Sequence, residues 1–221
     1  MSAIWGGEGV FDLRQERVMA EPTYRTRPTA APLWAVQSLV FIASMGTGVV
    51  TNGIFFIARE GFGFSTTQNF ALGTVLGLTY IAGAFGVGPV LRRVAARSSA
   101  VSSRSVLVGL SAVMGGAAIL PQLAVRLAAD PAGAAWSVWV AVALYSLCSG
   151  AFWPIVESYL GGGRSGQRLR RAVGQFNIIW AVAVLGSLWA MGPALERYPY
   201  GVLMVFGFVQ VAGTLLLWPM G

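Results

Sequence analysis

Side chains able to do polar chemistry are rare in this chain, and the most prominent is an acid inside a long apolar segment. Glu157 is the only acid within any of the long apolar runs. A charged acid near the centre of a bilayer costs about 2.5–3.5 kcal/mol, but Glu157 lies only about one turn from the end of its run, close to Arg164 and Arg168, where the cost is lower. On a helix, Glu157 shares one face with Trp153, four residues earlier. We expect Glu157 either to bind a proton or a cationic solute, or to pair with Arg164 or Arg168 in the connection that follows.

Amide side chains occur in two other apolar runs. Asn52 and Phe55 lie on one helical face, and Asn177 and Trp180 lie on one face of a later run. Hydrocarbon offers an amide no hydrogen-bond partner, so these faces should look into the protein or into a wet cavity. The candidate residues for lining a substrate-binding cavity, or for bonding between helices, are Asn52, Phe55, Trp153, Glu157, Asn177 and Trp180.

The residues that are missing exclude several kinds of chemistry. All 15 basic residues are Arg, and the sequence contains no His. Catalytic Ser-His or Cys-His pairs and His-ligated zinc or haem are therefore excluded. The single Cys148 rules out an intrachain disulfide and a cysteine metal cluster. We predict a protein that is not an enzyme, with no catalytic residues, no metal and no cofactor.

These polar residues must be positioned by helices that cross a membrane. Of the 221 residues, 56% are hydrophobic and only 10% are charged, whereas soluble domains carry about 25% charge. A span needs about 20 apolar residues. Six such runs occur, at residues 33–58, 69–91, 106–125, 134–160, 172–195 and 200–219. We predict an all-α membrane protein with a mobile cytoplasmic tail at 1–32 and a domain of six transmembrane helices at 33–219.

The arginines predict the topology. Twelve of the 15 lie in the tail or in the connections after the second and fourth runs, and three lie on the other side. Because positive loops stay in the cytoplasm, both termini should be cytoplasmic, in a multi-pass protein of the cell (inner or plasma) membrane. The net charge of +7 then reflects topology, with the arginines in contact with anionic lipid headgroups, and we expect no binding to nucleic acid.

The string Gly150-Ala-Phe-Trp-Pro-Ile-Val-Glu157-Ser-Tyr-Leu, followed by an Arg-rich connection and Phe176-Asn177-Ile-Ile-Trp180, resembles the N-terminal half of major facilitator superfamily transporters. The family's loop motif would fall on Gly88, Arg93 and Arg97. Its Asp, which helps to latch the two halves of a transporter, is replaced by Arg92. The resemblance implies an MFS-like half bundle.

Family members have about twelve helices in two halves, with the substrate between them. We therefore expect a secondary transporter module that moves a small solute by alternating access, with or without proton coupling. It would work with a second six-helix half from the same or a separate chain. Three interpretations fit a chain with six helices: a fragment of a longer protein, a half-size transporter that dimerises, or a remnant that does not transport. The alternative function is a non-transporting membrane scaffold or accessory subunit.

Overall fold

A computed structural model describes residues 31–97, 102–128 and 130–220, so the predicted tail lies almost entirely outside the described residues. The described chain is helical and contains no strand. Its elements are α1 (Leu33–Gly46), the π-helix η2 (Thr47–Asn52), α2 (Ile54–Phe62), α3 (Thr66–Arg97), α4 (Ser103–Leu127), the 3-10 helix η3 (Ala132–Ala134), α5 (Trp136–Gly161), α6 (Gly166–Arg197), α7 (Pro199–Ala212) and the 3-10 helix η4 (Gly213–Met220).

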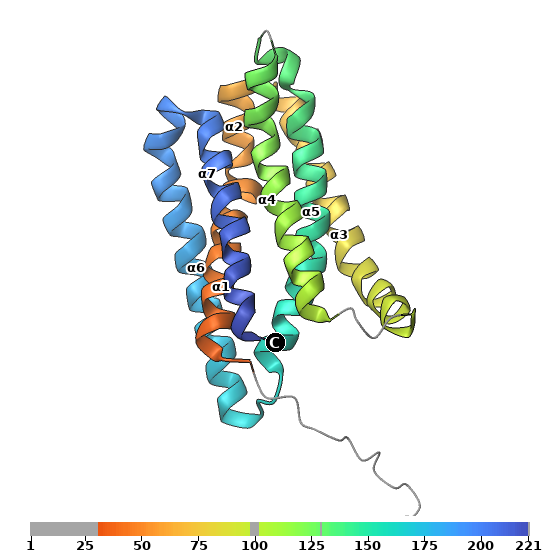
Figure 1. Cartoon of the computed structure of the whole chain (residues 1–221). Coiled ribbons are helices and arrows are strands. Elements are labelled where there is room, and N and C mark those ends of the chain that lie inside the picture. The colour runs from red at the N-terminus through yellow and green to blue at the C-terminus, as the bar shows by residue number, and fades with distance from the viewer. Residues whose placement is uncertain (1–30, 98–101, 129, 221) are drawn as a thin grey trace, which may run out of the picture.

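Six stretches of the described chain are long and apolar enough to cross a membrane. They overlap the six predicted runs, with ends that differ by up to six residues; the fourth, for example, covers Ala132–Gly161. The helices run roughly side by side along one direction (Figure 1). The prediction of an all-α membrane protein is confirmed, and the six spans make it a multi-pass one.

The first span contains a break that the hydropathy does not indicate. Between α1 and α2 the backbone widens into η2, and the N–H of Gly53 bonds to the carbonyl of Gly48, five residues back, at 2.8 Å. This wider turn rotates the residues after it relative to a regular α-helix. The chain then continues as α2 until Gly63, whose φ of +68° lies in the left-handed region that ends a helix.

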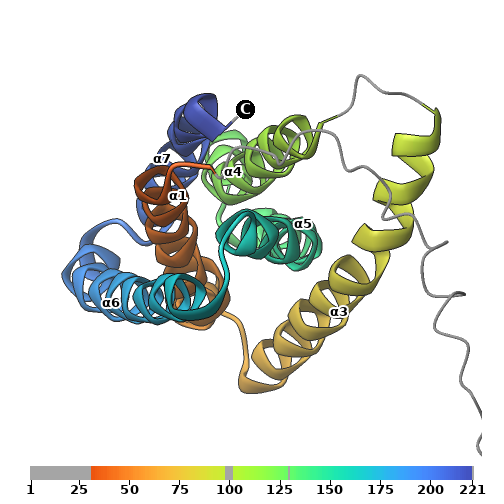
Figure 2. The ribbon, with the colours of Figure 1, turned by 90° about the horizontal axis from the view of Figure 1, so that it is seen from below.

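The six spans divide into two sets of three with equivalent places. Viewed along the bundle, α3 and α6 lie at the two sides of one face, α1 and α5 lie between them, and α4 and α7 lie at the opposite face (Figure 2). The first and fourth spans are thus central, the second and fifth flank them, and the third and sixth are behind. Helix α3 packs on α5, and α6 correspondingly packs on α1 and η2.

Small residues allow the helices to approach closely at equivalent points. A Cβ atom on Gly115 of α4 would lie 2.7 Å from the carbonyl oxygen of Gly207 on α7. Likewise, a Cβ atom on Gly207 would lie 2.7 Å from the carbonyl oxygen of Gly115. Between α3 and α5, a Cβ on Gly150 would lie 2.2 Å from the carbonyl oxygen of Tyr80. Between η2 and α6, a Cβ on Gly48 would lie 3.0 Å from the carbonyl oxygen of Val184. Close backbone approach is a main source of helix association in lipid.

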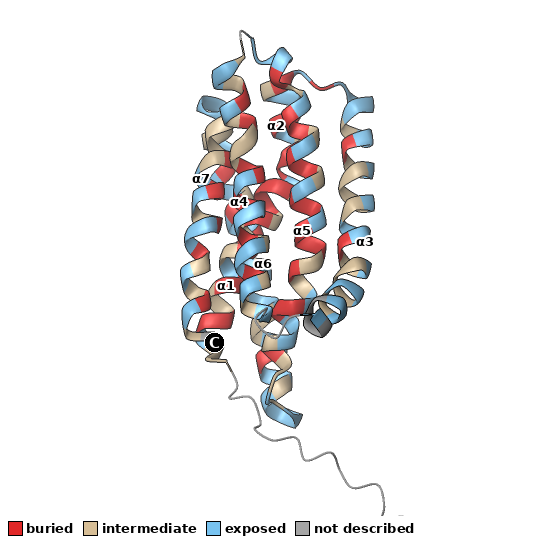
Figure 3. Ribbon diagram, turned by 45° about the vertical axis from the view of Figure 1, so that its right-hand side comes forward, coloured by how far each residue is buried: buried red, intermediate tan, exposed pale blue. Residues whose placement is uncertain are grey.

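The helices differ in how far their neighbours cover them. Half or more of the most apolar stretch is buried in the first span (56%) and the fourth (50%), against 11% in α3 and 22% in α6. In Figure 3, α3 accordingly consists mostly of exposed and intermediate residues. The two flanking helices therefore leave one face of the bundle open between them.

Two prolines lie inside helices that continue past them. Pro154 lies within α5, which continues to Gly161, and Pro193 lies within α6, which continues to Arg197. Each proline removes only one backbone donor. Membrane helices tolerate this because neighbouring groups satisfy the freed carbonyl.

Candidate functional site

A cavity of about 640 Å³ lies on the open face of the bundle and receives residues from η2, α3, α5 and α6. It is bounded by hydroxyl, aromatic, amide and carboxylate side chains as well as apolar ones. The lining residues are Thr47, Thr51, Leu76, Gly77, Tyr80, Ile81, Ser149, Trp153, Glu157, Phe176, Asn177 and Trp180. Four of the six residues proposed from the sequence thus come together at one place.

The α5 wall carries Trp153 and Glu157. The ring of Trp153 meets the ring of Phe176 on α6 edge-on, with centroids 6.0 Å apart and planes at 90°. This contact fixes the indole at the junction between α5 and α6. Glu157 lies one turn further along the same wall and is exposed to the cavity side. The carboxylate can therefore reach a solute that rests against the tryptophan.

The arginines after α5 make other contacts. Arg164 donates to the carbonyl oxygens of Tyr159 at 3.0 Å and Leu160 at 2.9 Å, and to that of Ala31 at 2.7 Å. These bonds satisfy the last carbonyls of α5 and anchor the start of the first span. Arg168 lines a separate cavity beside Arg171 and Gln175. In the described part of the chain, Glu157 therefore has its carboxylate available in the cavity and is not engaged by Arg164.

The α6 wall carries Asn177 and Trp180, three residues apart and both exposed. Helix α6 is held to α1 close to this wall by a hydrogen bond from Nε2 of Gln37 to Oε1 of Gln175, with a length of 2.8 Å. The half-buried amides of Gln37 and Gln175 thus bond the two helices to each other. Asn177 instead lines the solute cavity.

Asn52 and Phe55 lie elsewhere. The amide nitrogen of Asn52 donates to the carbonyl oxygen of Thr47 in its own helix at 3.0 Å, and the side chain is exposed outside the cavity. Phe55 lines a different cavity of about 510 Å³ with Asn69 and Gly73. Thr47 and Thr51 of the π-helix, rather than Asn52, line the solute cavity.

The candidate loop motif is helical as far as it is described. Gly88, Arg93 and Arg97 belong to the last turns of α3, which continues past the predicted end of the second run at residue 91. Arg93 and Arg97 are exposed there. The connection itself, at 98–101, lies outside the described residues.

Sequence reasoning missed several members of the site. Tyr80 supplies a phenol from α3, and Ser149 is buried on α5 two turns before Glu157. The spacing of Gly77, Tyr80 and Ile81 places them on one face of α3, and this was the signal that could have identified Tyr80. Hydroxyl groups are a weak signal because they are common throughout membrane helices.

The site combines one carboxylate, one amide, several hydroxyl groups and four aromatic side chains within a largely apolar enclosure. Such a set can bind a small polar molecule, with rings that pack against its flat or cationic part. Among the described residues, no three His, Cys, Asp or Glu side chains lie together as metal ligands. Comparison with protein families, curated proteins and solved structures finds no match.

Proposed function

We propose that this protein is a module of a secondary transporter, in which the cavity between α3 and α6 holds a small solute. The observation that carries this proposal is the convergence of Glu157, Asn177 and Trp153 on a cavity of about 640 Å³. Binding sites for small molecules typically have volumes of about 300–1,000 Å³ with few polar groups. A scaffold has no need to keep these three side chains together in one cavity within the spans.

The arrangement of the spans supports an MFS-like half bundle. Two sets of three spans occupy equivalent places, and an odd number of spans per set means that the second set runs inverted across the membrane. Inverted repeats of three helices within a six-helix half are a property of major facilitator transporters. This agrees with the resemblance carried by residues 150–160 and 176–180.

The open face supports a second six-helix half as the partner. Phe70, Ile81 and Phe85 on α3 are 75%, 52% and 80% exposed. The second half, from another copy or another chain, would complete the cavity wall between the flanking helices, and rocking of the two halves would expose the solute to each side in turn. The lone carboxylate suits a cationic solute or a coupling proton.

Glu157→Gln is the variant that tests this role, because it removes the charge and keeps the shape. We would compare it with the unmodified protein and with Glu196→Gln, the same change at an exposed residue outside the cavity. Cells expressing each protein would be offered a pooled set of small cationic and neutral metabolites, and accumulation would be measured by mass spectrometry. We expect at least one solute to accumulate with the unmodified and Glu196→Gln proteins but not with Glu157→Gln.

The melting temperature of each purified protein separates transport from folding. An unchanged melting temperature with lost accumulation supports the cavity role. A lowered melting temperature with unchanged accumulation assigns Glu157 a structural role instead. If no protein causes accumulation, the scaffold function is favoured. If a strictly monomeric preparation transports in liposomes, the second half is not required.

A further inference from the structure

A second cavity, of about 670 Å³, lies between α6 and α7 and shares no lining residue with the candidate solute site. Its walls also include parts of α1, η2 and α4. Along α7 the lining extends from Pro199 to Val209, which is about 15 Å at 1.5 Å per residue. That length is about half of the roughly 30 Å hydrocarbon layer. The cavity thus covers the depth of one leaflet.

The inner end of this cavity is apolar apart from Ser187, whose hydroxyl donates to the carbonyl of Val184. Its walls there are formed by Met45, Met191 and Phe206, with Val205 and Val209 along α7. Val205 is 61% exposed, so the cavity is open sideways to the surrounding hydrocarbon. A groove of this shape accepts a flexible hydrocarbon chain, and methionine side chains adapt readily to such a chain.

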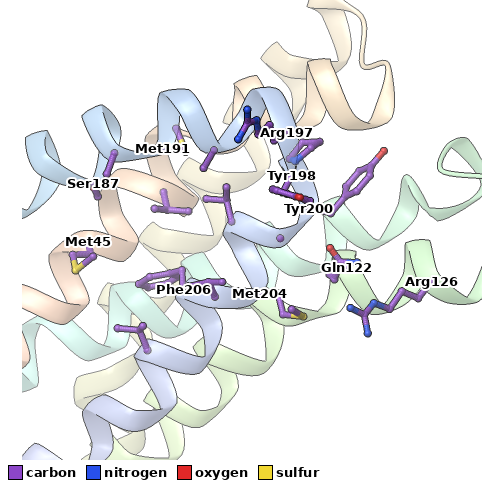
Figure 4. A pocket seen from close by; sticks show the side chains of 18 residues that line it. Met45, Gln122, Arg126, Ser187, Met191, Arg197, Tyr198, Tyr200, Met204 and Phe206 are labelled. Carbon is purple, nitrogen blue, oxygen red and sulfur yellow. The ribbon is translucent and has the colours of Figure 1, made fainter.

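The other end is polar and positively charged. Figure 4 shows Gln122, Arg126, Tyr198, Tyr200 and Arg197 gathered toward one end of the cavity, while Met45, Ser187 and Phe206 lie toward the other. Arg126 and Arg197 are two of the three arginines that lie away from the tail and the Arg-rich connections. The acids nearest in sequence are Glu196, which does not line the cavity, and Asp130, whose Oδ1 accepts from the backbone N–H groups of Ala132 and Gly133.

We infer that this groove binds an anionic phospholipid from the leaflet opposite the Arg-rich connections. One acyl chain occupies the space between α6 and α7, and the headgroup phosphate lies at the end formed by Arg126 and Arg197. Guanidinium groups bind phosphate oxygens through paired hydrogen bonds and stay charged at every physiological pH. The bilayer is the source of the ligand because exposed lining residues, Val205 on α7 and Ala190 on α6, border the groove within the spans.

The test uses the full chain in nanodiscs that contain a trace of phosphatidylglycerol with a photoactivatable group on its acyl chain. After illumination, labelled peptides are identified by mass spectrometry. Phosphatidylcholine with the same group is the zwitterionic comparison. We expect phosphatidylglycerol to label peptides of α6 and α7 that line the groove, and phosphatidylcholine to label them roughly tenfold less, since each arginine near a membrane surface contributes severalfold to anionic lipid binding.

The variants are Arg126→Gln with Arg197→Gln, and Arg59→Gln as a matched control. Arg59 is the third arginine on that side and lines a different cavity. We expect the double variant to lower phosphatidylglycerol labelling to the phosphatidylcholine level and Arg59→Gln to leave it unchanged. In addition, Ala190→Phe should reduce labelling by both lipids, because Ala190 lines the groove and a phenyl ring there fills it.

Unchanged labelling in the double variant, or labelling spread evenly over α3 and the groove, would overturn the inference. Should the double variant not fold, competition on the unmodified protein decides the question. Excess unlabelled phosphatidylglycerol should displace the probe while phosphatidylcholine does not. Equal displacement by the two lipids would show that the arginines select no anionic headgroup.

Discussion

Substitution of Gly83 by alanine tests the close crossing that places the α3 wall of the cavity. A Cβ atom at this position would lie 2.0 Å from the carbonyl oxygen of Leu147 and 3.2 Å from the backbone nitrogen of Ala151, both on α5. Ordinary contacts begin near 3.4 Å. Because both neighbours are backbone atoms, no side chain can move aside, and α3 must shift from α5 by about 1.4 Å, the difference between 3.4 Å and 2.0 Å.

Gly86 provides the matched control on the same helix. A Cβ at Gly86 would meet nothing within 4 Å among the described residues. Gly86→Ala should therefore stabilise the helix by about 0.5–1 kcal/mol, since alanine loses less conformational freedom on folding. Gly83→Ala gains the same amount but strains the crossing, and overpacking of this kind costs about 1–3 kcal/mol.

Thermal unfolding in detergent, followed by circular dichroism, measures both effects. For a chain of this size, 1 kcal/mol corresponds to about 2–4 °C in melting temperature. We expect Gly83→Ala to melt several degrees below Gly86→Ala. Gly150→Ala should behave like Gly83→Ala, and the double substitution should be less than additive because one separation of the helices accommodates both methyl groups. Equal melting of the Gly83 and Gly86 variants would refute the close approach.

Two further predictions concern buried amides and topology. Gln210 is 1% exposed, and neither amide atom has a hydrogen-bond partner among the described residues, so Gln210→Met should raise the melting temperature. Gln175→Met, which removes the acceptor of the Gln37 bond, should lower it; the reverse order would contradict the reasoning. For topology, cysteines replacing the exposed Ser102 and Asp130 are labelled from outside intact cells, with little background from the buried Cys148. We expect labelling at position 130 alone, and labelling at 102 alone would reverse the orientation.

The sequence by itself determined the six spans and most of the polar residues of the site. Whether a segment can span a bilayer depends on its own length and apolar composition. The fourth span could therefore be located from the sequence to within a few residues. The same argument identified Glu157 and Asn177, because a polar side chain in such a run needs a partner or water. Their pairing with Trp153 and Trp180 followed from helical spacing along regular α-helices.

The tertiary structure decided which faces meet. In the π-helix at Thr47–Asn52, Thr47 and Thr51 line the cavity while Asn52 bonds to the carbonyl of Thr47, and the π-helix arises from local backbone hydrogen bonds that leave no mark in hydropathy. The sequence cannot distinguish Gly83, which contacts α5, from Gly77, which borders the cavity. A side chain's environment depends on the rotation of its helix against neighbours distant in sequence, and that rotation is set by packing of the whole bundle.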